Sequence, residues 1–515
     1  MRNYGVLPLA LLVAAPVMAN NAVGKTYFSQ HNWFGAASPE RLAMARNRMN
    51  RKDEGKGVAF EAVLFAEQTT DEQGLRDYFL PFEGKTKLIA GETGSTAYTI
   101  GTNNPTGTVG AADLVAGYFN VQTGTVGSSS ANLTSQLTFQ SELSFAPKQT
   151  VVGIGLQWQQ RLPKKWWLKV SAPITHVKND LHMTEDVINE GKGVSITGAV
   201  ANMTAAFKQE AMRYGKIDGA QEKWGVADIE VLVGRHGFDH EYAQACWYVG
   251  MVIPTGKKPT AEYLWEAVVG NNKHFGVMLG GSTRLVWKEG DDYVLAVCCD
   301  TNGRFLFENT QKRMLDLKGK PWSRYFLLVK EADFPTSGNF EDNRADLELG
   351  VNVLTQDVKV APHGSFTGNT ALNFRKDNGF EAEVGFNLYV REAEKIKLKN
   401  AFANADNYGI PYLGSFVDSA AATTNSFQTI NRAFIDEGGD AGTTNTFLAL
   451  AEADLDLNSA AHPAVYENTV YATLGMNWDK CKMPVFVNVG GAYTFNENNA
   501  CAKRWGIWGK AGVSF

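Results

Sequence analysis

The residues of this sequence with the greatest chemical potential are charged side chains at every second position of apolar segments. Glu381 and Glu383 flank Ala382, and Arg504 and Lys510 share one parity near the C-terminus. Successive side chains of a β-strand point to opposite faces, so this spacing puts the charges on one face and the apolar residues on the other. Such a face can attract ions and orient polar solutes, which is the chemistry of a channel wall.

The sequence carries no recognisable catalytic or metal-binding pattern. No G-x-S-x-G motif occurs, and no glycine-rich stretch has a Walker lysine. His236 and His240 are four residues apart but fall in a predicted turn rather than on a helix. The acidic run 452–458 has oxygen ligands for calcium but lacks the glycine of a calcium loop. We therefore predict that the chain is not an enzyme and has no cofactor and no metal site.

Composition and the N-terminus limit the class of protein. The chain has 515 residues, a net charge of −5 and 20% charged residues, which gives no reason to expect binding to nucleic acid. Its mean hydropathy of −0.23 is too low for a helical membrane protein. Arg2, the apolar run 7–13 and Val17-Met18-Ala19 predict a cleaved signal peptide over residues 1–19. An exported chain without an apolar helix is periplasmic, extracellular or a closed barrel.

Alternating segments of apolar and polar residues recur from residue 57 to the C-terminus. They predict a meander of strands, sixteen in number, or fourteen if the segments 113–122 and 325–329 are not strands. The predicted strands are 58–67, 113–122, 133–145, 152–161, 166–175, 226–235, 242–253, 274–288, 293–308, 325–329, 346–354, 358–375, 380–391, 465–478, 485–496 and 502–515.

Aromatic residues on the apolar parity flank the short turns, which favours a barrel in lipid over a soluble sandwich. Rings gathered at one end of every hairpin suit a membrane interface, where they form a girdle. The short turns near 163, 290, 377 and 480 then fall on the periplasmic side, and the long segments near 205, 263 and 430 fall outside. The predicted girdle consists of Trp158, Trp166, Trp287, Tyr293, Phe374, Phe380, Trp478 and Phe515.

With its signal peptide, its meander and a terminal Phe515, the chain resembles a Gram-negative outer-membrane β-barrel of the porin-like kind. The resemblance implies an all-β fold, an antiparallel up-and-down transmembrane barrel with long extracellular loops that contain short helices. It also implies bacterial outer-membrane lipid as surroundings and the barrel assembly machinery as a partner of the C-terminal strand. Residues 225–229 and 253–256 are similar to stretches in importers of hydrophobic compounds of the fatty-acid-transporter type.

Residues 20–56 precede the predicted barrel domain, 57–515, and are not strand-like. Ser38-Pro39-Glu40 is a helix start, and the basic residues from Arg41 to Lys52 follow it. This segment is expected either in the periplasm or as a plug in the lumen. The acidic loop 398–464 is expected either to constrict the pore or to cover its outer mouth.

The predicted function is passive diffusion of small solutes or ions through the outer membrane. The alternatives are a transporter of hydrophobic small molecules with residues 20–56 as the plug, and a surface barrel whose loops bind partners. The substrate, the ion selectivity and the oligomeric state stay open. The predicted lumen-lining residues are Glu142, Arg161, Lys169, Asp228, Glu230, Arg284, Lys288, Arg304, Asp346, Glu348, Arg375, Glu381, Glu383, Arg391, Glu467, Arg504 and Lys510.

Overall fold

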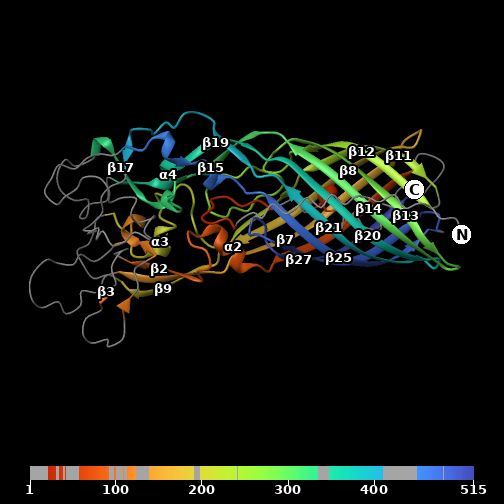
Figure 1. Cartoon of the computed structure of the whole chain (residues 1–515), viewed down its shortest axis with the longest axis horizontal. Helices are drawn as coiled ribbons and strands as arrows, with labels where there is room; N and C mark the ends of the chain where they lie inside the picture. Colours follow the sequence, from red (N-terminus) through yellow and green to blue (C-terminus); the bar gives the residue numbers. More distant parts are fainter. Residues whose placement is uncertain are drawn as a thin grey trace, which may run out of the picture.

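The computed structural model is elongated, with a β-barrel at one end and a layer of loops and small sheets at the other (Figure 1). It describes residues 21–30, 34–38, 41, 57–91, 98–99, 108–109, 113–122, 139–190, 198–240, 242–333, 347–409, 449–479 and 481–515. We call the loop layer the cap layer. Its residues are the described parts of 70–147, 181–228, 254–275, 307–362, 392–464 and 497–503.

Twelve antiparallel strands close the barrel, each paired with its neighbours on both sides. Strand β1 lies between β27 and β7, and the β7–β8 pairing completes the ring. In order around the wall the strands are β1 (Val58–Thr69), β7 (Lys148–Arg161), β8 (Trp166–Asp180), β11 (Ile229–Asp239), β12 (Ala243–Ile253), β13 (Gly276–Glu289), β14 (Tyr293–Leu306), β20 (His363–Lys376), β21 (Phe380–Arg391), β25 (Val465–Trp478), β26 (Val485–Asn496) and β27 (Arg504–Ser514).

The predicted count of sixteen strands, or fourteen, is wrong. The described residues of four predicted segments, 113–122, 133–145, 325–329 and 346–354, contribute to the cap layer instead. Leu143, Phe145, Leu327 and Leu349 bury their side chains in a core formed by the cap layer itself. Alternation reports one buried face and one exposed face, and it does not say whether lipid or a protein core covers the apolar side.

The outer face of the barrel is apolar, as a lipid-facing surface requires. Leu64, Leu279 and Val489 expose 63%, 66% and 63% of their surface to the outside of the barrel. Large apolar side chains are normally buried in soluble proteins, so a continuous band of this kind indicates burial in a bilayer. In the described part of the chain, no helix is both long and apolar enough to cross a membrane.

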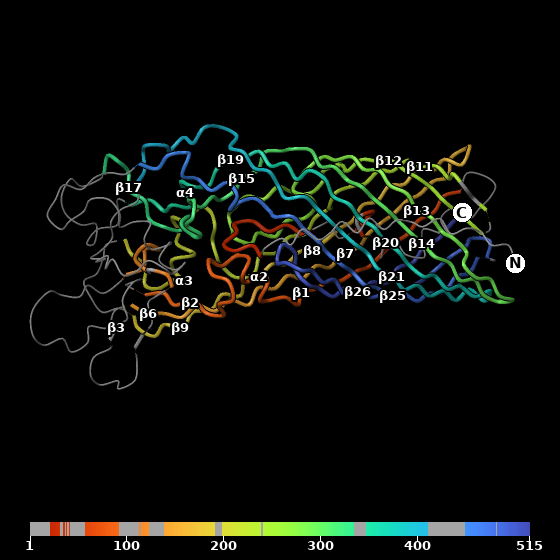
Figure 2. Tube along the Cα trace, in the orientation of Figure 1, coloured from red at the N-terminus to blue at the C-terminus, as the bar shows by residue number. Residues whose placement is uncertain are grey.

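Connections are short at one end of the barrel and long at the other, as predicted. The short connections join β7 to β8, β11 to β12, β13 to β14, β20 to β21 and β25 to β26, and we call this the short-turn end. The tube in Figure 2 ends here with the C-terminus, opposite the cap layer. The Phe515 amide donates to the Val58 carbonyl at 2.9 Å, and the Val58 amide donates back at 2.8 Å. The last residue therefore helps to close the barrel against β1.

The cap layer holds small sheets and short helices. Its strands are β2 (Lys87–Gly91), β3 (Tyr98–Thr99), β4 (Thr108–Val109), β5 (Leu114–Val115), β6 (Gln140–Phe145), β9 (Met183–Asn189), β10 (Gln221–Val226), β15 (Asn309–Met314), β16 (Asp316–Leu317), β17 (Leu327–Lys330), β18 (Leu347–Leu349), β19 (Thr355–Ala361), β22 (Lys395–Leu398), β23 (Tyr408–Gly409) and β24 (Leu455–Asp456). Its helices are α2 (Glu72–Phe79), η2 (Ala116–Phe119), α3 (Met203–Ala206), η3 (Ser323–Tyr325), η4 (Glu331–Asp333), α4 (Gly350–Leu354), η5 (Glu452–Asp454) and η6 (Leu457–Ala460).

Aromatic packing stabilises the cap layer as it would a soluble core. Trp322 is fully buried and meets Phe207 with ring centroids 5.6 Å apart, and Phe119 packs on Phe326 at 5.5 Å. The chain after β1 continues into α2, whose Asp71 side chain accepts the Gly74 amide as an N-cap. In the long loop after β9, α3 forms a single helical turn.

Candidate functional site

The polar parity of the barrel strands points inward and is buried there. Glu230 on β11 forms an ion pair with Arg304 on β14, and these side chains expose only 2% and 5% of their surface. Their strands are not neighbours in the wall, so the pair bridges part of the interior. Two buried charges need such pairing, because an isolated charge removed from water is strongly disfavoured.

A second cluster of charges lies where β1, β25 and β27 meet the described N-terminal segment. The Arg504 guanidinium donates to both Glu467 oxygens at 3.1 and 3.0 Å and lies 3.3 Å from Glu67 Oε2. Glu67 also pairs with Arg41 of the N-terminal segment. All four side chains are at most 9% exposed. The cluster therefore links the barrel wall to the chain inside it.

The third inward group is a hydrogen-bonded set of carboxylates on β21. The Asn373 amide donates to Glu381 at 2.8 Å and to Glu383 at 3.0 Å. Tyr471 donates its hydroxyl to Glu383 at 2.8 Å, and Asn477 donates to Glu381 at 2.8 Å. Three adjacent strands thus hold the two carboxylates in place, as polar groups buried in a wall require.

Part of the N-terminal segment lies inside the barrel, where η1 (Gly35–Ala37) touches the inner wall. The Ala36 amide donates to Glu230 Oε2 at 2.9 Å. Lys510 donates its ammonium to the Arg41 carbonyl at 2.9 Å. The expected helix that starts at Ser38 falls mostly outside the described residues, and Ser38 itself follows η1.

Phe34 of this segment fills an apolar patch on the inner wall. Its ring stacks on Phe65 with centroids 6.5 Å apart and planes at 5°. A β-carbon built on Gly155 would overlap the Phe34 ring, so only glycine admits the ring at this place. Around Phe34, the patch is formed by the buried barrel residues Val63, Phe65, Val151, Val177, Cys298, Ala371, Tyr471 and Trp508, together with Ala227, Ala267 and Val269 of the adjoining cap layer.

This apolar patch is a feature that strand parity did not predict. Val63 and Phe65 occupy the inward parity of β1, where a polar face was expected, and Trp508 shares its inward face with Arg504 and Lys510. The sequence does carry a signal for this patch. An apolar residue interrupts the polar parity of one strand, and a glycine faces it on the neighbouring strand, as Gly490 of β26 does beneath the Trp508 ring.

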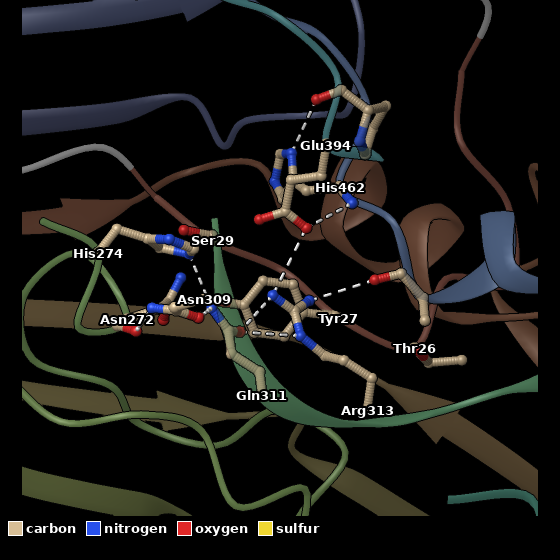
Figure 3. A network of polar contacts seen from close by, with 12 residues as sticks. Thr26, Tyr27, Ser29, Asn272, His274, Asn309, Gln311, Arg313, Glu394 and His462 are labelled. Carbon is tan, nitrogen blue, oxygen red and sulfur yellow. Dashed lines mark hydrogen bonds and ion pairs between the residues drawn. The ribbon is translucent and has the colours of Figure 1, made fainter. Parts of the chain in front are cut away.

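Beyond the barrel, side chains of the cap layer contact the N-terminal segment through the polar network of Figure 3. Thr26 donates its hydroxyl to the Met314 carbonyl at 2.8 Å, and the Tyr27 ring lies 3.1 Å from the Arg313 guanidinium. Arg313 in turn donates to Gln311 at 2.7 and 3.1 Å. This contact combines a buried cation with an aromatic face and is strongly favourable when desolvated.

The upper part of the same network contains His462, which precedes β25 and is fully buried. Its backbone amide donates to Glu394 at 3.1 Å (Figure 3), and its Nδ1 lies 2.6 Å from Nη2 of Arg391. Nη2 of Arg391 also donates to the Ser29 carbonyl at 3.4 Å. The rings of Phe28 and Tyr78 lie 5.6 and 5.9 Å from the imidazole. The histidine therefore sits at the junction of segment, cap layer and barrel.

Acid is expected to loosen this junction. Burial first, and then the Arg391 charge, hold the pKa of His462 well below its usual 6.5. Below about pH 6.5, His462 is therefore protonated in the unfolded chain but neutral in the folded chain. The free energy of unfolding then decreases by about 1.4 kcal/mol for each unit by which the pH is lowered. Burial lowers the pKa of His274 in the same direction. In urea unfolding at pH 7.5 and 5.5, His462→Gln should lose part of the wild-type pH slope, and an unchanged slope would contradict this role.

Narrow cavities occur in the barrel wall and beside the N-terminal segment. One lies between β14, β20 and β21, lined in part by Arg304, Tyr389 and Arg391. Another lies beside Tyr27 and Gln30. Each has room for a few water molecules at most, far less than a drug-sized ligand needs.

The remaining predicted lumen residues fall in three places. Asp228 and Arg284 are buried, and Lys169 is half-buried; the Asp228 carboxylate accepts amides of Gly256 and Asn271 at 3.4 and 2.6 Å. Arg161, Lys288 and Arg375 lie at the short-turn end, where Arg375 pairs with Asp479. Glu142 and Glu348 lie in cap-layer strands outside the barrel, and Asp346 lies outside the described residues.

The aromatic residues predicted as a girdle lie near the short-turn end. Trp166 meets Trp247 with centroids 5.4 Å apart, and Phe60 contacts Phe515 at 5.9 Å. Trp287 exposes 71% of its surface. The remaining members are Trp158, Tyr293, Phe374, Phe380 and Trp478, of which Tyr293 stacks on Phe374 at 5.8 Å.

These features define a transmembrane β-barrel of the outer-membrane type. Neither a family model nor a curated protein matches the sequence. Among solved structures, the chain is similar to the COG4313 outer-membrane channel from Pseudomonas putida F1, with 9% identity over 90% of this chain and 97% of that chain and a TM-score of 0.36. It is also similar to a Pseudomonas aeruginosa FadL homologue, with 8% identity, 96% and 98% coverage and a TM-score of 0.27. A third similar structure is the Pseudomonas putida toluene transporter TodX, with 7% identity over 95% of this chain and 98% of that chain and a TM-score of 0.26.

Proposed function

We propose that the protein is a plugged transporter of the bacterial outer membrane that passes small hydrophobic molecules when its N-terminal segment shifts. In this proposal the signal peptide 1–19 is removed, residues 20–56 form the plug, and the cap layer faces outward. The short-turn end then faces the periplasm, as in other barrels of this type.

The observation that carries the proposal is the Phe34 ring in the apolar patch of the inner wall. A water-filled pore gains nothing from buried phenylalanine, valine and tryptophan side chains on its wall. A path for apolar molecules does, because each apolar group leaving water contributes about 25 cal/mol per Å² buried. Phe34 thus occupies the position that a small aromatic or aliphatic solute would take once the segment moves.

Barrel size supports a plug rather than a permanently open pore. Barrels of eight strands are filled by side chains, whereas those of sixteen or more leave an aqueous channel. Twelve strands give an intermediate interior, which the ion pairs and η1 occupy in part. Passive diffusion of ions would require this segment to leave the barrel, which would break its contacts with Glu67, Glu230 and Lys510.

Transport of a labelled monoaromatic hydrocarbon into cells with an intact outer membrane tests the proposal. Cells that express the chain should take up the compound faster than cells with an empty vector, and Phe34→Ala should increase the rate further. Purified wild-type protein in planar bilayers should show few conductance steps. Large, stable ohmic steps together with no gain in hydrocarbon uptake would replace this proposal with passive diffusion of ions and polar solutes.

A further inference from the structure

A three-stranded sheet of the cap layer continues the barrel wall outward. Its strands β15, β19 and β22 are paired in that order. They extend β14, β20 and β21, which are neighbours in the barrel in the same order. In Figure 1, β15 and β19 lie where the barrel meets the cap layer. One face of this sheet therefore stands directly above the outer surface of the barrel.

The outward face of this sheet is rich in lysine and also carries Thr310, Asp357 and Ala361. Lys359, Lys395, Lys397 and Lys399 are exposed, and Lys312 is half-buried. The opposite face buries Gln311, Arg313, Val358 and Val360. Asp357 is the single acid on the outward face of these strands, and it lies 3.3 Å from Lys312 Nζ. The face thus has a clear excess of positive charge.

Lys359 and Lys397 lie directly opposite each other in the β19–β22 register. Like charges at directly opposed positions of a sheet repel and destabilise the pairing. Lysine on an edge strand also prevents unwanted sheet pairing, which explains why the edge strand β22 carries lysines. It does not account for Lys359, because β19 is the central strand. An anion between the two ammonium groups removes the repulsion.

Four exposed phenylalanine side chains lie where the barrel meets the cap layer, two on the barrel strands β14 and β20 and two directly beside the ends of β13 and β14. Phe305, Phe307, Phe275 and Phe366 each expose 44–45% of their surface. Phe307 contacts Phe275 and Phe305 with ring centroids 5.8 and 5.4 Å apart. An apolar aromatic patch beneath a cationic face matches the two parts of an anionic lipid, its acyl chains and its charged headgroup.

We propose that this surface binds a phosphorylated glycolipid of the outer leaflet, with its phosphate groups between Lys359 and Lys397 and its acyl chains on the phenylalanine patch. The inference rests on the outward orientation of the cap layer given under Proposed function, but not on transport. Two exposed acids, Glu308 and Glu392, lie between the lysines and the aromatic patch. They direct the phosphate toward Lys359 and Lys397 rather than to the strand junctions.

Binding of bisphosphorylated lipid A to the purified full-length protein in detergent, measured by native mass spectrometry, tests this site. Each lysine near an anionic surface contributes about a fivefold increase in affinity, so Lys359→Gln should weaken binding about fivefold and K359Q/K397Q about thirtyfold. The matched control K318Q/K330Q removes two exposed cap-layer lysines outside this sheet and should bind like the wild type.

Two further ligands, dephosphorylated lipid A and inorganic phosphate, distinguish the contribution of the acyl chains from that of the phosphate groups. We expect weak binding of the former and little competition by the latter, because the site needs both phosphate and acyl chains. Equal binding of both lipids, equal loss in the control variant, or unchanged binding by Lys359→Gln would overturn the proposal. Aggregation of K359Q/K397Q with normal lipid binding by Lys359→Gln would assign the lysines to edge protection instead. Hydrocarbon uptake reports on transport separately.

Discussion

Replacing Gly155 with valine is expected to expel Phe34 from the barrel wall and open the lumen. The valine side chain needs the space that the Phe34 ring fills, and both cannot be accommodated on the inner face of β7. Overpacking of this kind costs about 1–3 kcal/mol. If the cost falls on the plugged state, the open fraction rises by about 5- to 150-fold. Planar-bilayer conductance and hydrocarbon uptake should both increase.

A matched control exists on the opposite face of the wall. Gly509 of β27 has open space where a β-carbon would lie, so Gly509→Val adds the same atoms without touching the segment. It should leave conductance and uptake unchanged. If Gly155→Val behaves like Gly509→Val while the barrel is properly folded, Phe34 does not occlude the path and the plug hypothesis fails.

The second large effect is expected from Arg504→Met. Arg504 lies between Glu67 and Glu467, and its removal leaves two buried carboxylates near each other, of which Glu67 still pairs with Arg41. Breaking a buried pair by removing one partner typically costs about 3–5 kcal/mol. The free energy of unfolding in urea should fall by about that amount, and the segment should be released more often.

Arg375→Met provides the comparison. Arg375 pairs with Asp479 at the short-turn end, where both side chains are partly exposed at 21% and 33%. Exposed pairs contribute about 0–1 kcal/mol, so this variant should unfold almost like the wild type. Equal stability losses in the two variants would mean that the cluster around Arg504 is no more important than a rim ion pair.

Strand parity predicted much of the wall. Phe60, Leu64 and Ile507 belong to the apolar parity and face outward, whereas Arg504 and Lys510 belong to the other parity and are buried. This succeeds because neighbouring strands in a barrel share one pleat, so one local pattern assigns a whole face. The role of the inward charges in conduction stays a prediction.

The alternating residues of this chain, together with its short turns, determined that it forms a barrel and which faces are apolar, because lipid selects for a period-two pattern that is local in sequence. Only the tertiary structure decided that residues 139–145 and 347–354 join a cap layer, and that Phe34 and Arg41 lie inside the barrel. Contacts such as Arg41–Glu67 and Glu230–Arg304 join residues far apart in the chain. No local pattern encodes these long-range pairings, since they form only when the closed wall brings its strands around the N-terminal segment.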